Sequence, residues 1–204
     1  MSTLGEMMAD PMTSANPLLA VMAATLYLCE GNYEEALRAC SACSSLEMHS
    51  MMINGYLKMD RSDLAERQLK QMQAQDDDAT LTQLCTAWVN VGPGGLKVQE
   101  AYYVFQELGD KFQWTCMLYN GSAACNMAMG RFDEAEKDLM EALRADAKNA
   151  ETLANLVTCN LHLGKPAVAQ RYITQLKAAD GSHPLAKRIA AADELFDRAV
   201  TNMM

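Results

Sequence analysis

The sequence contains one pair of cysteines at a spacing that metal and redox sites use. Cys40 and Cys43 are separated by two residues, as are the paired thiolates of zinc-binding and thioredoxin-like motifs. A zinc site of this kind needs a second Cys or His pair, and a redox motif needs a strand–helix–strand context, and the sequence offers neither. We therefore interpret both cysteines as packing residues of a helix and expect no redox or metal site.

Three further groups of residues have suitable chemistry at unsuitable spacing. The glycine-rich segment 92–97 is too short for the loop that brings a lysine and a hydroxyl to a phosphate and its magnesium ion. Residues 76–78 are consecutive aspartates and lack the alternation of a calcium loop. The histidines are too far apart to place two metal ligands on one helix face: His49, His162 and His183. We predict that the chain is not an enzyme and has no catalytic residue, no metal and no cofactor.

Composition and charge restrict the class of partner. Half of the 204 residues are hydrophobic and aromatic residues make up 6%, which favours close helix packing over sheets. Acidic residues outnumber basic ones by 26 to 17 and no Lys/Arg cluster occurs, so we expect no nucleic acid partner and membrane contact only through another protein. The seven scattered cysteines and the lack of a signal peptide or a long apolar run predict a cytoplasmic protein.

A turn followed by the start of a helix recurs along the chain. The sequence GRFDEA at residues 130–135 reappears as GNYEEA at residues 31–36. Ala101, Ala135 and Ala169 are spaced by 34 residues, which is the period of the tetratricopeptide repeat, a unit of two helices. In each unit the alanine allows the two helix backbones to approach closely.

This period predicts an all-α fold, a tetratricopeptide-like α-solenoid of about five helix pairs plus a C-terminal capping helix. We expect residues 1–16 to form a flexible N-terminal arm and residues 17–204 to form the helical repeat domain. The last helix is expected from Leu185 to Val200, with Pro184 in its first turn. The predicted pairs span residues 17–46, 48–74, 80–108, 115–145 and 151–179.

Several segments are more specific than the repeat pattern. They are residues 78–84 (DATLTQL), 99–107 (QEAYYVFQE), 151–156 (ETLANL) and 171–177 (RYITQLK). In these segments the chain resembles the epsilon subunit family of coatomer, and the resemblance extends from about Pro17 to Val200. Family members carry further helical repeats before this region, so the resemblance implies an N-terminally shortened member.

The resemblance also implies a function. Members of this family are non-catalytic structural subunits of the coatomer vesicle coat and bind the C-terminal region of the alpha coatomer subunit. We therefore expect a role in Golgi-to-ER and intra-Golgi transport. The expected location is cytoplasmic, and peripheral on Golgi membranes and coated vesicles.

A generic tetratricopeptide adaptor or co-chaperone, which binds a peptide in its concave groove, is the alternative. A clamp for acidic peptides needs Lys or Arg on the first helices of the pairs, and Lys58 is the one such residue in the predicted first helices. The sequence therefore favours the coat subunit.

The partner is expected to contact the first helix of each pair, because stacked pairs curve so that these helices line the concave surface. The candidate partner-binding residues, which are uncharged, follow by projection from the packing positions: Asn54, Leu57, Thr86, Val89, Asn120, Ala124, Met127, Thr158 and Leu161. For Met127 and Leu161 a place in the core is an equally good interpretation of the spacing.

Overall fold

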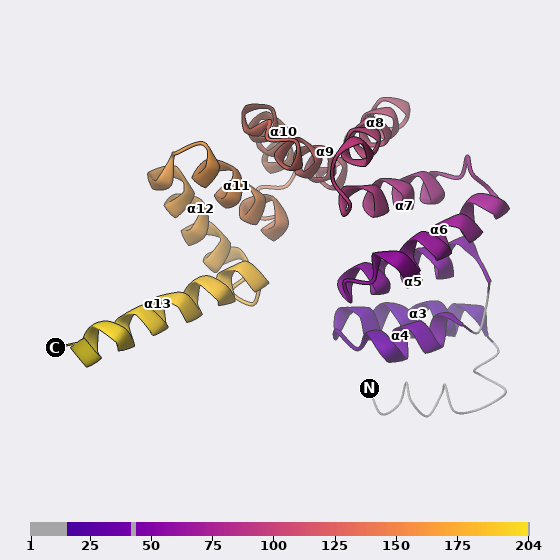
Figure 1. Ribbon diagram of the computed structural model, residues 1–204, viewed down its shortest axis with the longest axis horizontal. Helices are drawn as coiled ribbons and strands as arrows, with labels where there is room; N and C mark the ends of the chain where they lie inside the picture. The colour runs from indigo at the N-terminus through magenta and orange to yellow at the C-terminus, as the bar shows by residue number, and fades with distance from the viewer. Residues whose placement is uncertain (1–15, 42–43, 204) are drawn as a thin grey trace. The chain divides into compact units, whose positions relative to one another are not determined.

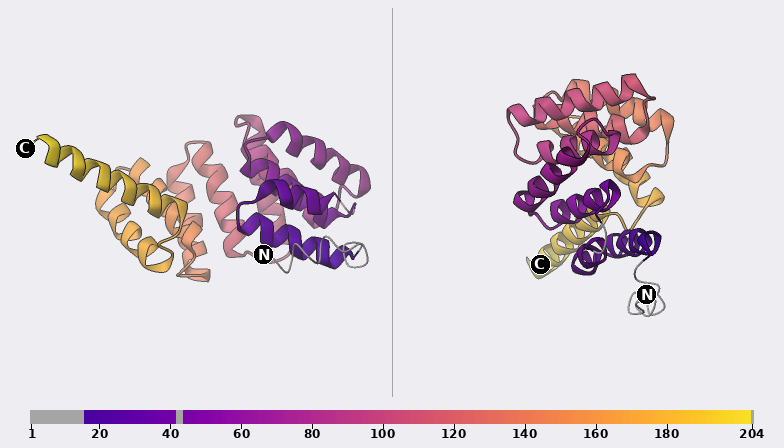
Figure 2. Two further views of the ribbon diagram at one scale, coloured as in Figure 1. Left: turned by 90° about the horizontal axis from the view of Figure 1, so that it is seen from below. Right: turned by 90° about the vertical axis from the view of Figure 1, so that its right-hand side faces the viewer.

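The computed structural model of the chain describes residues 16–41 and 44–203 and is built of helices (Figures 1 and 2). Within these residues it contains eleven helices and no strand, so the all-α prediction is confirmed. The predicted arm lies outside the described residues apart from Asn16, whose side chain caps the first helix. The helices are α3 (Pro17–Cys29), α4 (Tyr33–Cys40), α5 (Leu46–Lys58), α6 (Ser62–Gln75), α7 (Thr80–Val91), α8 (Leu96–Lys111), α9 (Cys116–Ala128), α10 (Phe132–Ala145), α11 (Ala150–His162), α12 (Pro166–Ala179) and α13 (Pro184–Met203).

Consecutive helices pack as pairs in α3 with α4, α5 with α6, α9 with α10 and α11 with α12, each with a first helix (helix A) and a second helix (helix B). In the order of the repeat, α7 takes the place of a helix A and α8 that of a helix B. The helix B elements α4, α6 and α10 also pack against the helix A of the following pair, as a stacked repeat requires. The chain divides into two compact units, an N-terminal unit that ends at Val104 and a C-terminal unit that begins at Phe105. The division falls inside α8.

The predicted limits of the pairs are close to the observed ones except at the end of the first pair. That pair was expected to reach Leu46, but α4 ends at Cys40, and Leu46 is the first residue of α5. Two serines explain the difference. The Ser41 hydroxyl donates to a carbonyl in the last turn of α4 (2.7 Å), and the Ser45 hydroxyl accepts from a backbone N–H in the first turn of α5 (3.3 Å). Serines that bond the backbone in this way favour helix ends over helix interiors.

Most turns inside the pairs contain a residue in the left-handed conformation. Gly31, Gly130 and Gly164 have φ values of 76°, 76° and 69°. Asp60 takes the equivalent place between α5 and α6 with a φ of 62°. Asp is one of the few residues other than Gly that enter this region, because its short side chain can bond the local backbone.

The repeated alanines lie where the two helices of a pair cross. Ala101, Ala135 and Ala169 are 0% exposed, as the repeat predicts, and Ala65 of α6 is 0% exposed as well. In the C-terminal unit, Ala123 of α9 joins Ala135 in one buried cluster. The N-terminal and C-terminal cores are thus built around small residues that set a short distance between helices.

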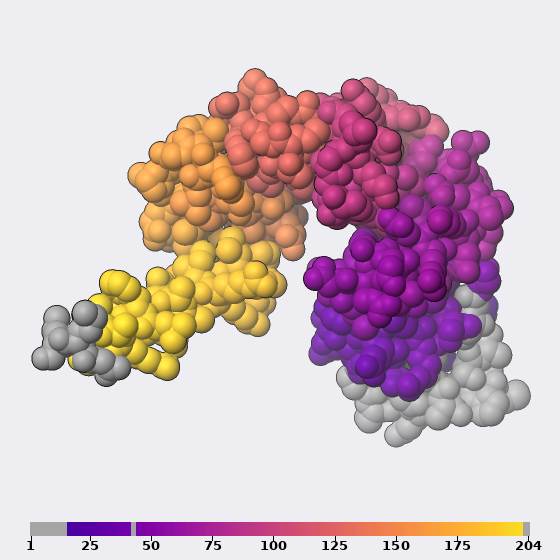
Figure 3. Space-filling model, in the orientation of Figure 1, coloured from indigo at the N-terminus to yellow at the C-terminus, as the bar shows by residue number. Residues whose placement is uncertain are grey.

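The capping helix α13 is packed at its beginning and open further along. Leu185 and Ala186 pack in one cluster with Leu153 and Leu176, which covers the last helix pair. Leu195 and Phe196, in the second half of α13, are 64% and 68% exposed. Figure 3 shows the end of α13, in yellow, projecting from the rest of the C-terminal unit. At 20 residues α13 is the longest described helix, but neither it nor any other described helix has the combination of length and apolarity that a membrane span needs.

Four cysteines are core residues. Burial raises the pKa of the Cys85 thiol to about 12 and the pKa of the Cys40, Cys125 and Cys159 thiols to about 11. Such thiols stay protonated at neutral pH and are poor nucleophiles and metal ligands. Cys43 lies outside the described residues, so the interpretation of the Cys40 and Cys43 pair as packing residues stays a prediction for Cys43.

Replacing Ala135 by Trp should destabilise the fold. The site is fully buried between α9 and α10, and overpacking a close helix crossing costs about 1–3 kcal/mol or more. Thermal unfolding followed by circular dichroism measures the effect, and Ala145→Trp at the exposed end of the same helix is the control. Equal melting temperatures for the two variants would show that the helix register is wrong.

The thiols should differ in their rates of alkylation. Cys29 is exposed, whereas Cys40, Cys85, Cys125 and Cys159 are buried. We expect iodoacetamide to label Cys29 in the folded chain and the four buried thiols after unfolding in guanidinium chloride, because a protonated, inaccessible thiol does not react. Peptide mass spectrometry reads each site separately. Labelling of Cys85 in the folded chain at the rate of Cys29 would contradict the packed core.

Candidate partner-binding surface

In the N-terminal unit, the predicted residues divide into half-buried and buried ones. Asn54 on α5 is half-buried, and Leu57 packs against the cluster that contains Ile53 and Leu69. Val89 on α7 belongs to that cluster and is 1% exposed. Val89 is therefore removed from the candidate surface, because its side chain is enclosed by the core.

Thr86 and Val89 also face a different direction from the predicted one. Together they line a hollow of about 400 Å³ whose other walls come from the helix B elements α6 and α8. Glu66 on α6 and Lys97 on α8 form an ion pair of 2.9 Å at this hollow. The two α7 residues thus point between helix B elements instead of onto a surface made of helix A elements alone.

In the C-terminal unit, two of the predicted residues are open to a partner. Thr158 on α11 is exposed, with its hydroxyl donating to the Ala154 carbonyl (3.2 Å), and Leu161 one turn on is 53% exposed. Ala124 and Met127 on α9 are half-buried, and Met127 packs against the buried cluster of α9, α10 and α11. Thr158 and Leu161 are therefore the strongest members of the predicted set.

The predicted residue Asn120 connects two helix A elements. Its Nδ2 donates to the Cys116 carbonyl and to Thr152 Oγ1, both at 2.8 Å. Its Oδ1 accepts from Asn155 Nδ2 at 2.9 Å. Because Thr152 and Asn155 belong to α11, Asn120 fixes α11 against α9 and acts as a positioning residue.

Sequence reasoning missed Asn155 and Thr152. Asn155 lies 35 residues after Asn120, one residue outside the 34-residue period, so projection by the period passed over it. The sequence-based prediction also left out a row of apolar residues on α3. Leu18, Met22 and Leu26 recur every four residues, so they share one helix face. They are 65%, 54% and 47% exposed.

A carboxylate is half-buried between α9 and α10. Asp138 Oδ2 accepts hydrogen bonds from Ser122 Oγ at 2.7 Å and Asn126 Nδ2 at 2.9 Å. Burial raises the pKa of Asp138, and these two hydrogen bonds partly oppose that change. Because its partners are buried helix A residues, Asp138 joins the two helices and does not face a substrate site.

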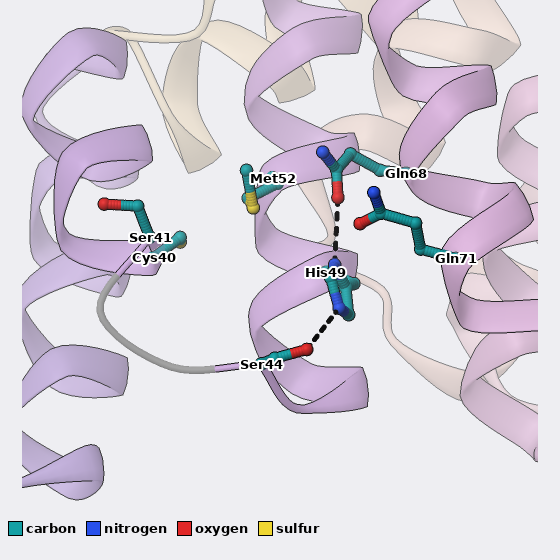
Figure 4. Close-up of a pocket in the computed structure, with 7 residues that line it drawn as sticks. All are labelled: Cys40, Ser41, Ser44, His49, Met52, Gln68 and Gln71. Carbon is teal, nitrogen blue, oxygen red and sulfur yellow. Dashed lines mark hydrogen bonds between the residues drawn. The ribbon is translucent and has the colours of Figure 1, made fainter. Parts of the chain in front are cut away.

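A second hollow, of about 460 Å³, opens between α4 and α6 (Figure 4). Its floor is α5, where His49 is 7% exposed. His49 Nδ1 lies 2.9 Å from Gln68 Oε1, which can only accept, so the ring proton is on Nδ1. Nε2 is then the acceptor for the Ser44 hydroxyl (3.1 Å) and for Gln75 Nε2 (3.2 Å).

This arrangement has the order of a hydrolase triad but not its chemistry. A serine next to a histidine base needs a third group that stabilises the imidazolium, and the neutral amide of Gln68 does this far less well than a carboxylate. The N–H of Gln75 also occupies the His49 nitrogen that would accept the serine proton. The described residues, moreover, include no group of three or more His, Cys, Asp or Glu that could hold a metal ion.

Charge is nearly absent from the helix A elements. Across α3, α5, α7, α9 and α11, all of them fully described, Lys58 is the one Lys or Arg. Glu47 and Glu151 are the acidic residues of these five helices, and both lie in first turns. The helix A elements thus present mainly polar and apolar side chains with few charges, which suits a partner that binds by apolar burial.

Comparison with known proteins places this geometry in a family. The family model described as coatomer epsilon subunit matches residues 1–204. Coatomer subunit epsilon-1 of Oryza sativa subsp. japonica is 46% identical over 97% of the chain and 68% of its own length. Coatomer subunit epsilon of Dictyostelium discoideum is 36% identical over 96% of the chain and 66% of its own length. The chain thus spans about two thirds of the length of these relatives.

Solved structures show the same fold at low sequence identity. A thermophilic tetratricopeptide repeat protein of Thermus thermophilus has a TM-score of 0.76 at 16% identity, and the match covers 89% of this chain and 100% of that one. The Cut9-Hcn1 hetero-tetramer of the APC/C has a TM-score of 0.70 at 16% identity over 85% of this chain and 35% of that one. These likenesses confirm the tetratricopeptide-like solenoid, and the sequence relatives show that the chain belongs to the coatomer epsilon subunit family.

Proposed function

We propose that the chain is a non-catalytic structural subunit of the coatomer coat that binds the C-terminal region of the alpha coatomer subunit. The observation that carries this proposal is the family match over residues 1–204. The low charge of the helix A elements supports it, because a permanent coat contact is expected to bury apolar area. Golgi-to-ER and intra-Golgi transport, at the cytoplasmic face of Golgi membranes and coated vesicles, is the corresponding place of action.

The proposed contact surface centres on Thr158 and Leu161 in the C-terminal unit. Both are exposed on α11, and Leu161 offers an apolar side chain that is 53% exposed. Ala124 and Met127 of the same unit are half-buried and fit the edge of such a contact. Asn54 and Leu57 are half-buried in the N-terminal unit and are candidates for a contact of that unit. Asn120 contributes by holding α9 against α11.

An adaptor that clamps acidic peptides has less support. Such a clamp places several Lys or Arg side chains on helix A elements. In the described helix A elements Lys58 stands alone, near the end of α5. Affinity purification of the tagged chain from cell extract, followed by mass spectrometry, separates the two functions. Recovery of the alpha coatomer subunit supports the coat subunit, and recovery of chaperones instead supports the adaptor.

Replacing Leu161 by Asp should weaken binding to the C-terminal region of the alpha coatomer subunit by about 30-fold or more, because truncating or charging a central apolar contact costs about 2 kcal/mol or more. Thr158→Asp should weaken it as well. The matched control is Thr174→Asp on α12, since both threonines are exposed and bond the carbonyl four residues earlier. Isothermal titration calorimetry measures all three. Equal affinities for Thr158→Asp and Thr174→Asp together with normal binding by Leu161→Asp would move the contact elsewhere.

Salt should change this affinity little. Raising the ionic strength from 0.1 M to 1 M shortens the Debye length from about 10 Å to about 3 Å and weakens contacts between charges, whereas apolar burial is not screened. We expect dissociation constants that agree within a few-fold across this range. A steep loss of affinity in high salt would show that charged residues outside the helix A surface carry the contact.

A further inference from the structure

We propose that the hollow between α4 and α6 is a second binding site, which takes the uncharged main chain of an extended peptide segment from a partner protein. Among the described residues, seven side chains line it: Cys40, Ser41, Ser44, His49, Met52, Gln68 and Gln71. Its volume of about 460 Å³ lies in the range of pockets that hold small ligands and short peptide segments. The proposal does not depend on the contact suggested for α11.

The buried histidine directs one carboxamide into the hollow. Because His49 Nδ1–H holds Gln68 Oε1, the amide nitrogen of Gln68 faces away from the ring (Figure 4). His49 is in turn held on its other nitrogen by Ser44 and Gln75. The orientation of Gln68 is therefore fixed by a network of four side chains and needs no ligand to set it.

A second carboxamide lies beside the first. Gln71 is one turn further along α6, and its side chain points toward Gln68 (Figure 4). Two adjacent carboxamides offer both N–H donors and C=O acceptors, which match the N–H and C=O that each residue of an extended chain presents on one side. Met52 on the floor and Cys40 on the α4 side add apolar surface to the lining.

The absence of charge on the lining defines the class of ligand. None of the seven lining side chains is an Asp, Glu, Lys or Arg. Both ring nitrogens of His49 already have hydrogen-bond partners, Gln68 on one side and Ser44 and Gln75 on the other. A carboxylate or ammonium group would lose its hydration here without gaining an opposite charge, which is costly. An uncharged amide loses less hydration free energy, and it regains its hydrogen bonds from the glutamine side chains.

The test uses two probes that differ in one charge. They are the blocked dipeptide N-acetyl-Ala-Ala-N-methylamide and the same dipeptide ending in a free carboxylate. Binding is followed on the full chain by the methyl resonance of Met52 in methionine-labelled protein, assigned with Met52→Leu. We expect the blocked dipeptide to shift this resonance saturably and the carboxylate form to bind at least about tenfold more weakly, since it leaves an unpaired charge in a neutral site.

Two glutamines of α6 supply the matched variants. Gln71 and Gln73 are both exposed. Gln71 lines this hollow, whereas Gln73 lines the other hollow, which contains Thr86 and Val89. Gln71→Ala should weaken the blocked dipeptide by about three- to tenfold, the value of one lost hydrogen bond, and Gln73→Ala should leave it unchanged. An unmoved Met52 resonance, equal binding of the two probes, or equal effects of the two variants would each overturn the proposal.

Discussion

The close crossing of helix A and helix B at a fully buried alanine is the contact on which the other features depend. Ala135 is 0% exposed and shares a cluster with Ala123, so small residues face each other across the pair. The distance set there decides how the next pair stacks, and thus where α11 lies relative to α9. In the C-terminal unit the approach is closer still where helix B meets the following helix A, since a Cβ on Gly121 would lie 2.5 Å from the Phe105 ring. An alanine in place of Gly121 would have to displace the Phe105 ring, which is buried and cannot move as easily as the end of a flexible side chain.

Much of the fold could be predicted from the sequence because the repeat depends on glycine and alanine, and at its positions each of them favours one local structure. A glycine that recurs just before a helix predicts a turn, and an alanine at a fixed period predicts a close helix crossing. Gly130, with its positive φ, and the buried Ala135 confirm the two predictions. The end of the first pair could not be found in this way. Ser41 and Ser45 are compatible with a helix interior until their backbone hydrogen bonds are seen.

The candidate surface was harder to predict than the fold. One residue along a helix turns the side chain by about 100°, so an error of one position exchanges a groove residue for a core residue. Val89 is such a case, whereas Leu161 at the equivalent place on α11 is exposed. The difference arises because Val89 is covered by α6 and meets a hollow between helix B elements, and the angle at which these helices cross is not visible in the spacing of residues. The hollow around His49 was not foreseeable for the same reason, since α4, α5 and α6 all contribute to it.

The division of the chain inside α8 has a consequence for how it unfolds. Val104 and Phe105 are neighbours in one helix, yet each belongs to a different compact unit. Helix formation is cooperative, so the melting of one unit removes the backbone hydrogen bonds that hold the start of the other. Two units joined by a flexible linker melt as separate thermodynamic species, whereas units that share a helix are coupled in free energy. We therefore expect one coupled heat-absorption peak in calorimetry and not two independent ones.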